Sequence, residues 1–188
     1  MKNLKRISTV LVLALFSISC SNDDNNTPVN EEEVITTVRV TLVGGGQIVV
    51  LESRDLDGDG PNPPVISPVS GGALVAGVTY TGSTQFLNEL ESPAEDITVE
   101  VEEEGAEHQV FYQLTSSIGT VTYNDLDANG KPIGLDFTLV TNATATSGNL
   151  TVTLRHELNK NAAGVASGDI TNAAGSTDAE VTFPISVN

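Results

Sequence analysis

The clearest pattern in this chain is an alternation of apolar and polar positions. From Val38 to Val43 apolar side chains recur at every second residue, as expected for a strand with one buried face. Three glycines at 44–46 interrupt the pattern, and residues 47–52 form the expected second strand of a hairpin. The same alternation predicts further strands at residues 78–86, 109–114, 119–123, 135–140, 150–158 and 178–187.

Turn-rich segments separate these stretches, which gives about eight short strands along the chain. That number is typical of an antiparallel β-sandwich, and we predict a mainly β, immunoglobulin-like sandwich. Pro184 interrupts the last predicted strand, and proline has no backbone N–H to donate to a neighbour. The last strand is therefore expected either at the edge of its sheet or with the backbone nitrogen of Pro184 facing outward.

One segment fits two kinds of element. Residues 92–95, Ser-Pro-Ala-Glu, have the sequence of a capping box with proline at the first helical position. Ile97 and Val101 would then share one helical stripe, and Gly105 would end the helix. Ile97, Val99 and Val101 also alternate as a strand would. We predict one short helix from Pro93 to Glu104.

The N-terminus has the organisation of a secretory signal. Lys2, Lys5 and Arg6 precede a short apolar stretch at residues 10–16, and Cys20 follows Ser19. The apolar stretch is too short to span a bilayer as a helix. The segment resembles a bacterial lipoprotein signal, although Ser17 stands where leucine is usual. The resemblance implies a signal peptide at residues 1–19 and lipid attachment at Cys20.

The residues after Cys20 are polar and acidic. Ser21-Asn22-Asp23-Asp24-Asn25-Asn26 resembles the export signal of Bacteroidota lipoproteins that reach the outer face of the outer membrane. A plain solvated linker would have a similar composition. We expect residues 20–33 to be an acidic, disordered tether and residues 34–188 to form a single β-sandwich domain.

Charge narrows the range of partners. The chain has 8 Lys+Arg against 25 Asp+Glu, a formal net charge of −17. Nucleic-acid binding needs clustered basic side chains and is therefore not expected. Cys20 is the only cysteine, so the mature chain is expected to have neither a disulfide nor a thiolate metal site. Metal cations remain suitable ligands for so acidic a chain.

Two loops have the spacing of calcium ligands. The first contains Asp55, Asp57 and Asp59, and the second contains Asp125, Asp127 and Asn129, with Asp136 at the twelfth position. Oxygen atoms at alternate positions, followed by a glycine, suit a hard cation such as calcium. Asp, Asn and Gly are also the commonest turn formers, so plain turns are the alternative.

The two histidines of the chain lie at the ends of predicted strands. His108 shares a strand face with Val110 and Tyr112, and His156 shares one with Val152 and Leu154. Glu104 would approach His108 from the end of the predicted helix, and Glu107 and Glu157 would add an acidic rim. Imidazoles with a carboxylate suit zinc or another transition metal. The alternative is two unrelated histidines at the edge of the core.

Nothing in the sequence indicates an enzyme, since it has neither a nucleophile elbow nor an HExxH motif. Residues 55–65, 91–98, 107–112 and 154–157 resemble small Bacteroidota surface lipoproteins associated with TonB-dependent outer-membrane receptors. The resemblance implies association with such a receptor and does not by itself assign an activity. Our first hypothesis is a monomeric, non-enzymatic binding module on the outer membrane that captures a ligand such as a metal ion for a receptor of this kind. The alternative function is a structural or adhesive surface β-domain stiffened by calcium.

Overall fold

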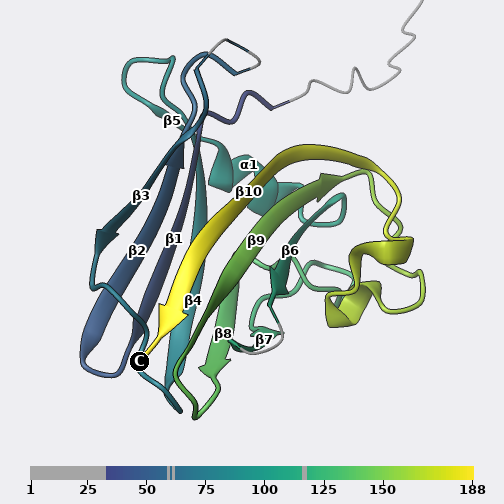
Figure 1. Cartoon of the computed structure of the whole chain (residues 1–188). Helices are drawn as coiled ribbons and strands as arrows, with labels where there is room; N and C mark the ends of the chain where they lie inside the picture. The colour runs from purple at the N-terminus through teal and green to yellow at the C-terminus, as the bar shows by residue number, and fades with distance from the viewer. Residues whose placement is uncertain (1–32, 59, 61, 116–117) are drawn as a thin grey trace, which may run out of the picture. The chain divides into compact units, whose positions relative to one another are not determined.

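Two antiparallel β-sheets face one another and form a sandwich, as seen in a computed structural model of the chain (Figure 1). The structure describes residues 33–58, 60, 62–115 and 118–188. The mainly β sandwich predicted from the alternating pattern is therefore confirmed. The predicted signal peptide, Cys20 and nearly all of the predicted tether lie outside the described residues.

The larger sheet has the strand order β3-β2-β1-β4-β8-β7, with the short β5 beside β4. Gly45 and Gly46 join β1 to β2, and both have positive φ angles of 59° and 75°. A two-residue hairpin turn of this kind needs left-handed backbone at both positions, which glycine adopts without strain. The strands of this sheet are β1 (Thr37–Gly44), β2 (Gln47–Arg54), β3 (Val65–Ser70), β4 (Thr79–Asn88), β5 (Glu95–Asp96), β7 (Gly119–Tyr123) and β8 (Asp136–Thr141).

The smaller sheet has the order β10-β9-β6 and lies across the larger one (Figure 1). Its strands are β6 (His108–Leu114), β9 (Thr146–His156) and β10 (Ser176–Val187). Pro184 lies in β10, an edge strand of this sheet, so its predicted edge position is confirmed. Pairing between β9 and β10 changes register between Thr177 and Ala179, which leaves Asp178 as the extra residue of a β-bulge.

The core lies between the two sheets. Val40, Phe86 and Phe137 from the larger sheet and Leu154 from the smaller one are fully buried there. A second, smaller cluster lies on the other side of β6, where Phe111 packs with residues from the segment after β9. That segment contains two short 3-10 helices, η1 (Val165–Ser167) and η2 (Ile170–Asn172). Strand β6 is therefore buried on both faces.

The contested segment contains a helix, but the predicted start was wrong. Helix α1 spans Ile97–Glu103, not Pro93 to Glu104, and Asp96 caps it by accepting a hydrogen bond from the Thr98 N–H. Glu95 and Asp96 instead pair with β4 as β5, so an extended backbone delays the helix. Ile97 and Val101 are both buried, as the helical stripe predicted.

The predicted number of about eight strands was too low, because β3 and β5 were missed. Strand β3 contains a proline and exposes Val65 and Ile66, so it lacks the alternation of a half-buried strand. Strand β5 has only two residues. Strand β9 begins at Thr146 and ends at His156, whereas the pattern predicted residues 150–158.

Candidate functional site

The fold brings the two histidines into direct contact. His108 begins β6 and His156 ends β9, and the register of these strands places them directly opposite each other. Their rings stack with centroids 4.3 Å apart and planes 18° from parallel. Both residues are buried, with 0% and 5% of their surface exposed. Two ligands of the predicted transition-metal site are thus held side by side by a sheet.

Glu33 is the carboxylate closest to this pair. Its Oε1 lies 2.9 Å from His108 Nε2, and its Oε2 lies 3.9 Å from His156 Nδ1. Only 3% of the Glu33 side chain is exposed. Glu33 immediately precedes the folded domain predicted to start at residue 34, and its side chain belongs to the domain's interior.

Asp178 supplies a second buried carboxylate. Its Oδ2 lies 3.9 Å from His108 Nε2, and its side chain is 3% exposed. Burial and the nearby charge of Glu33 raise the pKa of Asp178 above its ordinary value. Because Asp178 is the bulged residue of β10, its side chain escapes the regular alternation of the strand.

Glu104 contacts His108 through its backbone. The carbonyl oxygen of Glu104 lies 3.3 Å from His108 Nδ1 and can only accept, so Nδ1 is the donor. In a neutral ring, Nε2 then has no proton, yet it faces a carboxylate oxygen 2.9 Å away. Two acceptors this close require a cation between them or a further proton, either on the ring or on the Glu33 carboxyl group. The carboxylate of Glu104 also has an oxygen within 4.8 Å of ligand atoms of Glu33 and both histidines.

Three buried atoms at this position have no hydrogen-bond partner among the described residues. They are Glu33 Oε2, His156 Nδ1 and Asp178 Oδ2. Buried polar atoms without a partner cost free energy and are rare in native proteins. Together with His108 Nε2 they form a set of two nitrogen and two carboxylate ligands, which we call the histidine–carboxylate site.

The spacing of these atoms suits a small divalent ion. When an ion has tetrahedral coordination and metal–ligand bonds of about 2.1 Å, its ligand atoms lie about 3.4 Å from one another. The contact between Glu33 and His108, at 2.9 Å, is shorter than that value. The contacts of Asp178 with His108 and of Glu33 with His156, both at 3.9 Å, are longer. Glu33 and both histidines have ligand atoms within 4.8 Å of one another, and Asp178 Oδ2 approaches this group at His108.

Two further glutamates lie on the outer side of His156. Glu107 Oε2 is 3.8 Å from His156 Nε2, but 60% of the Glu107 side chain is exposed. Glu107, His156 and Glu157 also have ligand atoms within 4.8 Å of one another. The acidic rim predicted from the sequence is thus present, and it lies outside the buried site.

The second calcium-like loop has protein donors for its carboxylates. Asp125 accepts hydrogen bonds from the backbone N–H groups of Gly134, Leu135 and Asp136. Asp127 accepts from the N–H groups of Asn129 and Lys131 and from the Lys160 ammonium group at 3.0 Å. Asp136 is exposed. A lysine therefore stands where the loop was predicted to hold calcium, and calcium binding there stays an unsupported prediction.

The first calcium-like loop is less complete. Asp57 accepts hydrogen bonds from the backbone and side chain of Asn62. Asp55 Oδ1 is buried and has no hydrogen-bond partner in the described part of the chain. Asp59 lies outside the described residues. Of the two predicted ligands of this loop that the structure describes, only Asp55 has a buried carboxylate oxygen without a protein donor.

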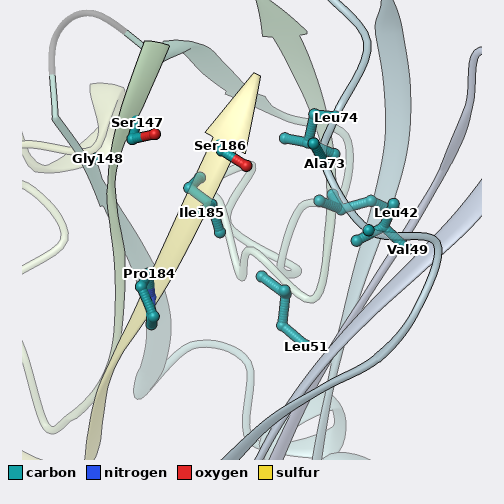
Figure 2. Close-up of a pocket in the computed structure, with 11 residues that line it drawn as sticks. Leu42, Val49, Leu51, Ala73, Leu74, Ser147, Gly148, Pro184, Ile185 and Ser186 are labelled. Carbon is teal, nitrogen blue, oxygen red and sulfur yellow. The ribbon is translucent and has the colours of Figure 1, made fainter. Parts of the chain in front are cut away.

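A separate cavity of about 410 Å³ opens at the other end of β10 (Figure 2). Ile185 lines one side and Leu42, Val49 and Leu51 line the other, where β10 faces β1 and β2. None of the described residues that line it is charged. It contains none of the predicted site residues, so it is unrelated to the histidine–carboxylate site.

Comparisons with protein-family models, curated proteins and solved structures found no match for this chain. Among the described residues, no helix has the length and apolarity needed to cross a bilayer. Function must therefore be inferred from the chemistry of the site itself.

The sequence identified His108, His156 and Glu104 as one group, and the structure places them together. The sequence analysis missed Glu33, which it assigned to the tether, and Asp178, which has the position of an ordinary strand residue. The position of Glu33 directly before the predicted domain, which starts at residue 34, was the only sequence signal for its role. Nothing in the sequence pattern predicts the β-bulge at Asp178.

Proposed function

We propose that this protein binds one divalent transition-metal ion, such as zinc, through His108, His156, Glu33 and Asp178. The observation that carries the proposal is the buried cluster of unpartnered nitrogen and oxygen atoms between β6, β9 and β10. Two buried carboxylates require compensating positive charge, and a divalent ion supplies it while leaving both imidazoles neutral. Nitrogen ligands favour zinc or copper over calcium, which prefers oxygen ligands only.

The biological role that we propose is metal capture without catalysis. Lipid attachment at Cys20 would hold the domain at the outer membrane, on the cell surface, and a TonB-dependent receptor would take up the captured ion. The sequence resemblance and the strongly acidic chain support this proposal. A fully buried pair of histidines suits tight retention of an ion better than turnover of a substrate.

Zinc titration of the purified, metal-free mature protein tests the function. We expect one zinc ion per chain by isothermal titration calorimetry. Zinc at a hundred times its Kd should raise the melting temperature by about 5 °C or more, because it binds only the folded state. Calcium, titrated in parallel, tests the two acidic loops.

The Glu103→Gln variant is the matched control, since Glu103 is exposed and lies outside the site. It should bind zinc as the wild type does. Absence of a stoichiometric zinc isotherm would refute the proposed function. A melting temperature that rises with calcium alone would support the calcium-stiffened surface domain instead.

Membrane attachment has its own test. In cells that process lipoproteins, Cys20→Ala should abolish labelling with radioactive palmitate and release the protein from the membrane fraction. The thiol at this position is the predicted acceptor of the lipid. Palmitate labelling that persists in the variant would contradict the lipoprotein assignment.

A further inference from the structure

An acidic cleft of about 600 Å³ adjoins the histidine–carboxylate site. The segment before β1, the end of β2 with its following loop, and the start of β10 form its walls. Glu33 and Asp178 line it, and both are also proposed ligands of the metal. The cleft therefore reaches the two carboxylate residues of the proposed site, and the two histidines lie behind them, outside its lining.

The ionisable side chains that line this cleft are acidic. Among the described residues, its ionisable side chains are Glu33, Asp55, Asp178 and Glu180, and none is a lysine, an arginine or a histidine. Oxygens of Glu33, Asp55 and Asp178 are buried and have no hydrogen-bond partner in the described part of the chain. The Glu33 and Asp178 side chains are each only 3% exposed. Unpartnered carboxylate oxygens that line a cleft create a strongly negative potential within it.

We propose that the metal reaches its site through this cleft as a hydrated, uncomplexed dication, and that anionic metal chelates are excluded. This inference rests on the proposed function and specifies the form in which the metal is captured. Asp55 and Glu180 attract the ion but do not bind it in the final site. Glu33 and Asp178 then replace part of its water shell.

The size of the cleft fits this route. Six water molecules occupy about 180 Å³ at their volume in the liquid. A cleft of about 600 Å³ admits an ion with its complete first shell. Inside the histidine–carboxylate site Glu33 and Asp178 each have an oxygen within 2.9 to 3.9 Å of His108 Nε2, so water must leave before the ion binds there.

Charge also sets the selectivity. An anionic chelate would bring its negative charge against four carboxylates in a partly enclosed space. The described residues that line the cleft offer such a chelate no cationic partner. A metal held by citrate or another polycarboxylate must therefore be released before it can bind.

Stopped-flow zinc binding tests the route. The double variant Asp55→Asn/Glu180→Gln should bind hydrated zinc about tenfold more slowly than the wild type, with an unchanged dissociation rate, because steering acts on association. The double variant Glu91→Gln/Glu103→Gln removes the same charge at exposed positions outside the cleft and should keep the wild-type rate. If the Asp55 change prevents folding, Glu180→Gln alone should slow association severalfold.

The second arm supplies zinc as its complex with radiolabelled nitrilotriacetate. We expect the rate of transfer to level off at the chelate's own release rate as protein is increased, with no label retained on the protein. Label that stays bound with the zinc would overturn the inference, as would equal association rates in the cleft variant and its control. In either case the proposed function would still hold if the wild-type protein binds zinc at equilibrium. If the wild-type protein does not bind zinc, both the proposed function and this inference are refuted.

Discussion

Replacing His108 or His156 by alanine is expected to weaken zinc binding by about a hundredfold or more, because each removes a nitrogen ligand. Changes in residues that merely support metal ligands already cost about 10- to 100-fold. The two rings form one stacked pair, and each supplies one nitrogen to the proposed site. The remaining ring therefore cannot replace the nitrogen that is lost. Competition with a fluorescent zinc indicator at neutral pH measures the loss.

Both histidines are buried, so their truncation also leaves a cavity that could destabilise the protein. Glu33→Gln avoids this problem, since it keeps the volume and removes the charge. We expect a loss of at least tenfold in zinc affinity for this variant. Wild-type affinity in all three variants would remove the histidine–carboxylate site from consideration.

Zinc affinity should also fall as the pH is lowered from neutral. Metal binding requires neutral imidazoles and ionised carboxylates, so protons compete with the ion. Burial and the charge of Glu33 raise the pKa of Asp178, and its proton therefore begins to compete at a higher pH than that of an ordinary aspartate. Affinity that stays constant between neutral pH and pH 5 would contradict this ligand set.

Lys160→Met is expected to lower the free energy of unfolding by about 3 to 5 kcal/mol. The Lys160 ammonium group donates to Asp127 Oδ2 at 3.0 Å, to the Pro132 carbonyl at 2.8 Å and to the Gly105 carbonyl. Lys160 is 5% exposed and the Asp127 side chain 2%. Burial alone would raise the pKa of Asp127, but backbone N–H groups and this ammonium group lower it below its ordinary value. Without the lysine, a buried carboxylate and two carbonyl groups lose their donor.

Urea unfolding measures this loss. Lys131→Met is the control, because it removes the same charge where the side chain is only half buried, and it should change stability by about 0.5 kcal/mol or less. The double variant Lys160→Met/Asp127→Asn should recover part of the loss, since the uncompensated charge is then gone. A loss below about 1 kcal/mol in Lys160→Met would show that the ammonium group does not support the loop.

Local patterns in the sequence were sufficient for much of the fold. Alternation of apolar residues predicted the sandwich, since a half-buried strand repeats every two residues whatever its neighbours are. The same rule placed His108 and His156 on apolar faces near strand ends. It failed for β3 and β5, where edge exposure and shortness remove the pattern, and it misplaced the start of α1, where pairing with β4 prevailed over a local capping sequence.

The sequence by itself therefore determined the fold class and two nitrogen ligands of the candidate site. Only the tertiary structure decided that these ligands meet, because register and strand order bring together residues 48 positions apart. The tertiary structure also places Glu33, which lies outside the predicted domain, beside His108. It contains the β-bulge at Asp178, and it brings Lys160 next to Asp127. Each of these depends on contacts between distant segments, which no local pattern of side chains encodes.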